Sequence, residues 1–242
     1  MATLLLRLAA PLQAWGDESK YDIRGTHNEP TKSGVIGLLA AAMGYRRDNE
    51  KISDMANKLR MGIRVDQPGI VIRDFHTARA PKYGKGGIIK YDIDGSIIME
   101  KDPYITQRYY LCDACFLVGL ECEDEGFLHD VIEALQSPVF PLYMGRRALP
   151  LSLPLILGIK TTDLETTLQQ AEWIAADWYK DKYKCIRARI ITETRKGKAA
   201  WYMQMDHPIS FSPIHRKYTL RGLDKERYVF LNTQKHDPMA AL

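Results

Sequence analysis

Two adjacent arginines, Arg146 and Arg147, stand in the segment YMGRRALP between a glycine and a proline. A guanidinium group presents a planar fork of N–H donors that matches a phosphate group. Gly145 lets the backbone approach a ligand closely, and Tyr143 offers a ring on which a base can stack. The segment therefore predicts a contact with an RNA backbone and an unstacked base. The same spacing is also compatible with arginines that pair with carboxylates at a domain junction.

A second basic segment, PTKSG at residues 30–34, partly resembles a phosphate-binding loop. A Walker A motif needs glycine at two places where this chain has Thr31 and Thr26, so the motif fails. What remains is a helix N-terminus with Lys32 and Ser33, whose free amides and dipole attract an anion. An ordinary helix cap with a solvated lysine explains the segment equally well.

The stretch RDFHTARAPKYGKGG mixes basic and aromatic side chains over residues 73–87. This mixture is typical of surfaces that bind single-stranded nucleic acid. It could also support metal-free RNA cleavage, in which a histidine or tyrosine takes the 2′-hydroxyl proton and a lysine steadies the phosphorane. A histidine near a strand end can equally make only a structural hydrogen bond. The candidates for such a reaction are His27, His76, Tyr83 and Lys85.

Metal and cofactor sites are not indicated by the sequence. It has no H-x-x-x-H, E-x-x-H or D-x-D-x-D-G arrangement, and no Rossmann glycine set. We therefore expect neither a metal nor a cofactor. Cys112 and Cys115 form a C-x-x-C, but no second pair of ligands stands nearby and the flanking residues are strand-like, so we expect free thiols.

The overall composition is that of an ordinary globular protein with a mild basic excess. The 242 residues include 34 basic and 30 acidic side chains, a net charge of +4, which argues only weakly for a polyanionic partner. Arg7 and Pro11 interrupt the apolar N-terminal stretch, which is too short to span a bilayer. We expect a cytoplasmic protein without a membrane contact.

Hydrophobic periodicity predicts an α+β fold for the first two thirds of the chain. The predicted order is strand, helix, strand, strand, helix, strand, which is the ferredoxin-like βαββαβ arrangement. The strands IIKYDI and SIIME flank an Asp-Gly turn and predict a protruding hairpin at about 78–104. The main expected elements are strands 4–8, 61–65, 69–77, 105–121 and 153–159, and helices 35–43, 50–59 and 126–136.

The last third of the chain predicts a second, smaller and β-rich unit. A helix at 163–173 is expected to precede strands near 184–194, 199–205 and 227–233. This divides the chain into a ferredoxin-like domain over residues 1–160 and a small C-terminal domain over residues 161–242.

Five blocks in the first two thirds of the chain resemble the CasD family of CRISPR-associated Cascade subunits, the type I-E branch of the RAMP superfamily. In order they are LRLAAPLQAWG, PTKSGVIGLLAAAMG, RDFHT, RYYLCDACF and YMGRRALPLSLPLILG. Together they cover residues 6–158, whereas the chain after about residue 160 matches only in general character.

The resemblance implies a RAMP fold: a ferredoxin-like domain with a glycine-containing loop after its second helix, a thumb hairpin and a small C-terminal β domain. It also implies a subunit that holds the 5′ handle of mature CRISPR RNA without cutting it. Such a subunit caps one end of the Cascade complex for antiviral defence. Its implied partners are the backbone subunit CasC and the large subunit CasA, with target DNA nearby through the complex.

Within this family the segment YMGRRALP occupies the place of the glycine-containing loop, and the hairpin at 78–104 occupies that of the thumb. A related subunit of type I-C systems cuts repeat RNA with a Tyr/Lys/His set, but here the Lys-His pair is Lys235-His236, in the tail. The predicted catalytic set is empty. The predicted RNA-binding residues are Lys32, Ser33, Arg73, His76, Arg79, Tyr83, Lys85, Arg108, Tyr143, Met144, Gly145, Arg146 and Arg147.

Overall fold

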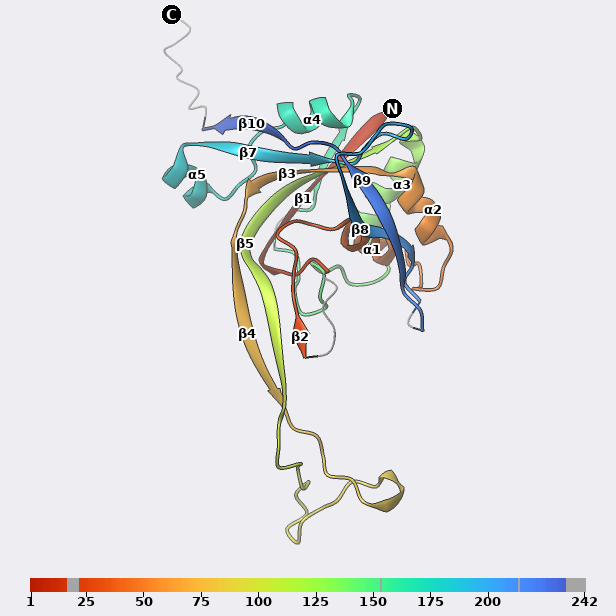
Figure 1. Ribbon diagram of the computed structural model, residues 1–242, viewed down its shortest axis with the longest axis vertical. Coiled ribbons are helices and arrows are strands. Elements are labelled where there is room, and N and C mark those ends of the chain that lie inside the picture. Colours follow the sequence, from red (N-terminus) through yellow and green to blue (C-terminus); the bar gives the residue numbers. More distant parts are fainter. Residues whose placement is uncertain (17–21, 153, 213, 234–242) are drawn as a thin grey trace, which may run out of the picture.

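A computed structural model describes residues 1–16, 22–152, 154–212 and 214–233. Its centre is one large, curled sheet that is antiparallel except for one short pair (Figure 1). The strands of this sheet are β1 (Ala2–Gln13), β2 (Ile23–Arg24), β3 (Arg60–Gln67), β4 (Ile70–Ala78), β5 (Tyr104–Cys122), β6 (Ile156–Lys160), β7 (Cys185–Thr192) and β10 (Arg227–Asn232). Their main order is β10-β7-β3-β5-β1-β6, with β2 and β4 also paired to β5.

Helices cover both faces of this sheet. The helices are α1 (Lys32–Ala42), α2 (Lys51–Lys58), α3 (Glu125–Gln136), α4 (Leu164–Gln170) and α5 (Asp177–Tyr183). The first three pack over the main core, and α4 lies on the opposite face against a second apolar cluster. The mixed α/β character predicted from the sequence is confirmed.

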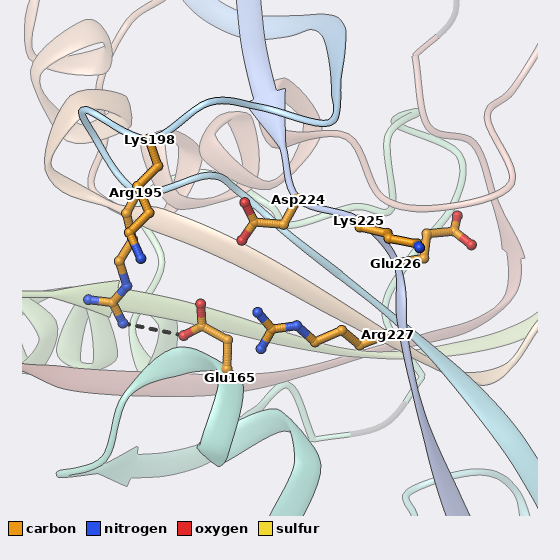
Figure 2. Close-up of a pocket in the computed structure, with 7 residues that line it drawn as sticks. All are labelled: Glu165, Arg195, Lys198, Asp224, Lys225, Glu226 and Arg227. Carbon is orange, nitrogen blue, oxygen red and sulfur yellow. Dashed lines mark hydrogen bonds and ion pairs between the residues drawn. The ribbon is translucent and has the colours of Figure 1, made fainter.

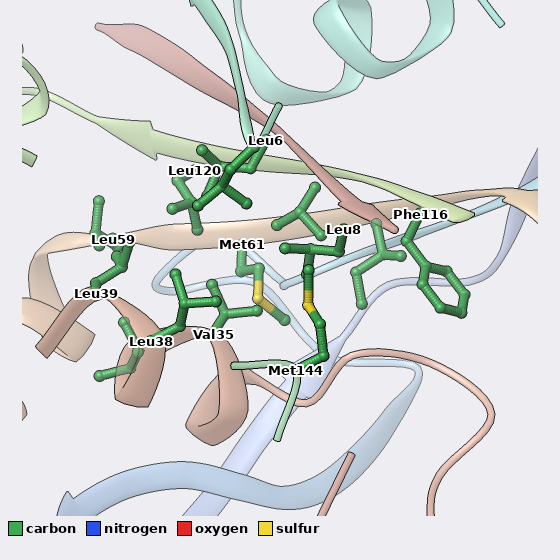
Figure 3. Packing of buried hydrophobic residues seen from close by; sticks show 14 of the residues in the cluster. Leu6, Leu8, Val35, Leu38, Leu39, Leu59, Met61, Phe116, Leu120 and Met144 are labelled. Atoms are coloured by element: carbon green, nitrogen blue, oxygen red, sulfur yellow. The ribbon is translucent and has the colours of Figure 1, made fainter. Parts of the chain in front are cut away.

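The main core lies between α1, α3 and the central strands (Figure 3). Alternate residues of β1 and β5, such as Leu8 and Phe116, point into it, and Leu39 of α1 meets them from the helix side. Met144, from the loop before β6, is fully buried in the same cluster. The segment with the two adjacent arginines is therefore anchored to the core by its own methionine.

Helix α4 approaches the sheet closely because glycines face it. A Cβ atom at Gly119 would lie 2.5 Å from the Leu164 side chain, and one at Gly62 would lie 2.7 Å from the Leu168 side chain. Larger residues at these two positions would push α4 off the sheet, since core side chains are close-packed.

Strands β4 and β5 pair antiparallel and project from the body as an arm (Figure 1). Residues 79–103 form the tip of this arm and, all being described, contain no regular strand. The prediction of continuous strands IIKYDI and SIIME was wrong: isolated bridges join Tyr83 to Ile89 and Tyr91 to Ile97. Gly86 and Gly87, which precede the first of these runs, have positive φ angles of 79° and 75° and lie in the turn that the Tyr83–Ile89 bridge closes.

The C-terminal third contributes to the central sheet and also forms a small sheet of its own. Strands β7 and β10 continue the central sheet beyond β3, while β8 (Tyr202–Ser210) and β9 (Lys217–Leu223) pair with each other, and β8 packs on α1 and α2. Helix α5 and strand β9 were not predicted from the sequence. The division of the chain at residue 160 into two domains stays a prediction.

Some sequence predictions fall outside the described residues, namely Leu153 at the start of the predicted strand 153–159 and the Lys235-His236 pair. Within the described part of the chain, no helix combines the length and the apolar character needed to cross a bilayer.

Candidate nucleic-acid interface

The loop of residues 143–150 has a fixed shape held by its own backbone. The Met144 amide donates to the Leu149 carbonyl at 2.8 Å, and the Leu149 amide donates to the Arg146 carbonyl at 2.9 Å. An antiparallel bridge joins Tyr143 to Pro150 at the base of the loop. The exposed part of this turn therefore presents Gly145, Arg146 and Arg147 from a rigid, core-anchored base.

Gly145 allows this loop to touch the end of β1. Its φ angle is +85°, and a Cβ atom built on it would lie 1.6 Å from the Ala14 carbonyl oxygen. The neighbouring Met144 carbonyl accepts a hydrogen bond of 3.0 Å from the Ala14 amide. Only glycine fits this contact, because any side chain would strike backbone in a conformation that L-residues avoid.

The Arg146 side chain is oriented by contacts that leave its charge uncompensated. Its Nη2 atom donates to the carbonyl oxygens of Arg24 at 2.9 Å and Gly25 at 3.1 Å. Its guanidinium carbon lies 4.6 Å from the centre of the Tyr110 ring, which is a cation–π contact. Its Nη1 atom is shielded from solvent and has no hydrogen-bond partner among the described residues.

Arg147 is exposed beside Arg146, and across the described ranges it has neither an ion pair nor a hydrogen bond. The prediction left open whether these arginines pair with carboxylates. Within the described part of the chain no carboxylate forms an ion pair with either of them. Both charges are therefore available to an external anion.

The base of the arm adds two further arginines to this surface. Arg24 on β2 lies directly beside Arg108 on β5 in their short parallel pairing. Arg108 lies two residues from Tyr110, on the same face of β5, and its Nε atom is buried without a partner among the described residues. We call the set Arg24, Arg108, Arg146 and Arg147 the arginine cluster. None of the four forms an ion pair with a carboxylate in the described ranges.

A histidine–carboxylate pair lies next to the arginine cluster on the arm. His76 Nε2 lies 2.5 Å from Asp74 Oδ2, and Asp74 is directly opposite Arg108 in the β4–β5 register. Thr106 is the cross-strand neighbour of His76. This pair shares a face with Arg108 because residues two apart on a strand point to the same side.

The remaining predicted contacts on the arm lie on its other face or at its tip. Arg73 is exposed on the other face of β4 from His76, and Arg79, Tyr83 and Lys85 belong to the tip. The structure therefore does not bring these four residues together with Arg146. They are spread along the arm, where an extended ligand would meet them in succession.

The predicted anion site at the start of α1 is occupied by groups of this chain. The Lys32 amide donates to Asp206 Oδ2 at 2.8 Å, and the Lys32 ammonium group lies 2.8 Å from both carboxylate oxygens of Glu193. Lys32 is only 1% exposed, and burial lowers the pKa of its side chain. Asp206 is held in turn by Arg221, at 2.8 and 2.7 Å.

Ser33 does not cap helix α1. Thr31 is the N-cap residue, and its hydroxyl accepts a hydrogen bond from the Gly34 amide at 3.2 Å. The Ser33 hydroxyl lies 3.3 Å from that of Thr31. RNA binding by Lys32 and Ser33 stays a prediction, and it would require Glu193 and Asp206 to give way.

Two cavities in the structure lie away from the arginine cluster. One, of about 370 Å³, is lined by charges of both signs: Glu165, Arg195, Lys198, Asp224, Lys225, Glu226 and Arg227 (Figure 2). Burial alone would raise the pKa of Glu165, but hydrogen bonds from Arg60 outweigh it and lower the pKa to about 2. The second, of about 1050 Å³, lies between α2, α3 and the end of β5.

The remaining candidate groups are the cysteines and the possible metal ligands. The four cysteines are free thiols, as the sequence predicted, and burial raises the pKa of Cys115 to about 12. No group of three or more histidine, cysteine or carboxylate side chains that could hold a metal occurs in the part of the chain that the structure describes.

The residues predicted from the sequence include most of this loop but not Arg24 and Tyr110. In the sequence, Arg24 belongs to a polar loop without a motif, and Tyr110 is one of several apolar residues in a long predicted strand. The available signal was positional: Tyr110 is two residues from Arg108, so the pair had to share one face of β5.

Solved structures share this fold, in which a curled antiparallel sheet carries few helices. One, titled "CRISPR RNA-guided surveillance complex", matches with a TM-score of 0.74 and 29% identity, covering 96% of this chain and 91% of that one. Another, titled "Crystal structure of Cas protein", matches with a TM-score of 0.66 and 33% identity over 94% of each chain.

Sequence comparison identifies the family to which the chain belongs. The family model described as CRISPR-associated protein (Cas_Cas5) matches residues 3–223. The CRISPR system Cascade subunit CasD of Escherichia coli (strain K12) is 30% identical over 191 residues, which are 74% of this chain and 81% of that protein. The chain belongs to the Cas5 family of CRISPR-associated proteins and is CasD-like. The family resemblance drawn from the sequence is confirmed.

Proposed function

We propose that this chain is a non-catalytic subunit of a type I-E Cascade complex that holds the 5′ handle of CRISPR RNA. The observation that carries the proposal is the arginine cluster, four guanidinium groups without carboxylate ion pairs in the described ranges, in a chain of the Cas5 family. Arginine forks match phosphate oxygens, and the cation–π contact of Arg146 with Tyr110 fixes one fork in place.

The proposal also assigns roles to the fold. The strand order β3-β5-β1-β6, with α1 after β1 and α3 after β5, supports a ferredoxin-like domain. The β4–β5 arm would act as the thumb and meet the guide through Arg79, Tyr83 and Lys85. CasC and CasA would be its neighbours, target DNA would lie nearby through the complex, and the assembly would work in the cytoplasm.

The experiment compares RNA affinity of the purified full chain with that of the double variant Arg146→Ala/Arg147→Ala. Each lost charge-assisted contact should cost about 1.5–3 kcal/mol of binding free energy. The dependence of affinity on salt should also become shallower, because fewer counterions are released.

A matched control exists within the chain. Arg46 and Arg47 are also adjacent, and a glycine and a tyrosine also stand just before them, but they are exposed between α1 and α2. Arg46→Ala/Arg47→Ala should leave affinity for handle RNA and its salt dependence nearly unchanged. Equal effects of the two double variants would contradict specific binding at the arginine cluster.

A second candidate function, metal-independent cleavage of repeat RNA, is favoured by one observation, the His76–Asp74 pair beside Arg108. A carboxylate can orient a histidine as a general base, and an arginine can stabilise the phosphorane. Labelled repeat RNA incubated with the chain in EDTA tests this. We expect no cleavage; products at one junction that vanish with His76→Ala would establish the nuclease instead.

A further inference from the structure

Strands β7 and β10 carry two arginines and two aromatic residues on one face. Tyr228 and Phe230 are two apart on β10 and point to the same side. Their direct cross-strand neighbours on β7 are Arg189 and Arg187, respectively. We call these four residues the β7–β10 platform.

The two faces of this strand pair differ sharply in burial. Ala188 and Leu231, on the other face, are buried in an apolar cluster with Trp173. On the platform face, Phe230 is 75% exposed and Tyr228 is 45% exposed. Folding alone does not require two neighbouring aromatic rings in solvent, so the platform is a candidate for binding.

One cation of the platform is unpaired and already stacked. The Arg187 guanidinium carbon lies 4.0 Å from the centre of the Tyr228 ring, and Arg187 forms no ion pair with a carboxylate in the described part of the chain. Arg189, in contrast, is held by Glu29 and by Glu226. The platform therefore combines one free positive charge with flat apolar rings.

The platform lies on the same face of the central sheet as the arginine cluster. Arg189 contacts Glu29, in the loop between β2 and α1, and Arg146 binds two carbonyl groups at the start of that loop, those of Arg24 and Gly25. A strand that leaves the arginine cluster over this loop would reach Tyr228 and Phe230 next.

We propose that the β7–β10 platform stacks unpaired bases of a single-stranded nucleic acid. Every base has a flat π face that aromatic rings and guanidinium planes accept without reading its sequence. Phe230 offers no hydrogen bond, so stacking is the interaction it can supply, and the charge of Arg187 complements the phosphate backbone. The inference rests on the proposed function, because the strand is expected to arrive from the arginine cluster.

The test uses the purified full chain and two RNA strands, one of handle length and one extended by unpaired nucleotides with a 2-aminopurine reporter. The wild-type chain should bind the extended RNA more tightly and quench the reporter through stacking. Phe230→Ala should weaken binding of the extended RNA by about 5- to 100-fold and abolish quenching, without affecting the short RNA. Phe230→Trp should preserve both properties.

The control is Trp178→Ala, which removes a 52% exposed aromatic ring from α5, on the other side of the β7–β10 pair. It should change neither affinity nor quenching. An extension made of deoxynucleotides distinguishes the source of the strand: equal gains from RNA and DNA mean that the platform accepts either, and a gain from RNA alone assigns it to the guide.

Failure of the two proposals gives different results in this assay. If Arg146→Ala weakens both RNAs but Phe230→Ala weakens neither, the platform is refuted and the handle site stands. If Arg146→Ala weakens neither, the handle site is refuted. In a separate pull-down of companion subunits, their loss with Phe230→Ala while extended RNA still binds would show a protein-docking surface and overturn the proposal.

Discussion

Two basic segments that look alike in the sequence occupy opposite electrostatic surroundings in the fold. Lys32 begins α1 and is buried against Glu193 and Asp206, whereas half-buried Arg146 and exposed Arg147 lie at the base of the arm without a carboxylate ion pair among the described residues. Both segments have the residue types that bind phosphate. The comparison teaches that an anion site depends on which positive charges remain unpaired after folding, because a cation already paired with a carboxylate attracts a further anion only weakly.

The largest expected effect comes from breaking the buried cluster. Lys32→Met would leave Glu193 partly buried without its partner, so the free energy of unfolding should fall by about 3–5 kcal/mol. Urea unfolding measures this loss, and Lys32→Met/Glu193→Gln should recover part of it. A loss of RNA affinity with unchanged stability would instead show that Lys32 binds RNA. The contrast between the Lys32 segment and the Arg146–Arg147 loop would then be wrong.

The loop of the arginine cluster should depend on its glycine nearly as strongly. Gly145→Ala places a methyl group against the Ala14 carbonyl at a φ of +85°, which should destabilise the loop by at least about 2 kcal/mol. Gly197→Ala is the matched control, since its φ is +82° but no atom lies within 4 Å. Thermal unfolding of both variants separates backbone strain from the contact, and equal losses would contradict the close approach to β1.

Paired and unpaired charges should also differ in their dependence on pH. The pKa of Glu165 is lowered from 4.5 to about 2 in the folded chain, so its stabilisation is present above pH 4.5 and is lost as the pH falls toward 2. Glu165→Gln should remove about 1 kcal/mol of this pH-dependent stability, since water screens the partly exposed pair. Unfolding curves from pH 6 to pH 2 test the effect, and Arg147→Ala, which breaks no pair, should keep the wild-type profile.

The smallest expected effect distinguishes the two hydroxyl groups at the start of α1. Thr31→Ala removes the N-cap hydrogen bond to Gly34 and should cost about 1 kcal/mol of stability. Ser33→Ala should stay within about 0.5 kcal/mol. The reverse order in urea unfolding would mean that Ser33 is the capping residue and that the arrangement around Lys32 is different.

The tip of the arm shows where local pattern failed in the fold prediction. Alternating apolar residues around Asp94-Gly95 predicted two strands, but a short strand pair gains little without a surface to pack on, and the tip forms isolated bridges instead. Local pattern also failed to predict α5 and β9. Helix α5 is held by packing on β7 and β10, and β9 is held by its pairing with β8, so both depend on contacts outside their own segments.

The candidate site was predictable where its residues are neighbours in sequence. Gly145, Arg146 and Arg147 form one loop and were predicted together, although the contact with Ala14 that requires glycine at position 145 is long-range. Arg24 joins the same surface because β2 pairs with β5 and because Arg146 donates a hydrogen bond to its carbonyl group. Tyr110 joins it through its cation–π contact with Arg146. Arg24 and Arg146 are 122 residues apart in the chain, so their spacing in the sequence does not reveal this contact.

The sequence by itself determined the apolar periods of the main strands and helices, the segment with Gly145, Arg146 and Arg147, and the family, because each of these depends on residues that are neighbours in the chain. Only the tertiary structure decided which cations are neutralised. The carboxylates that hold Lys32 come from 161 and 174 residues further along the chain, while none came to pair with Arg146 in the described ranges. Coulomb attraction acts through space and depends on burial, so its outcome is fixed only when the chain has folded.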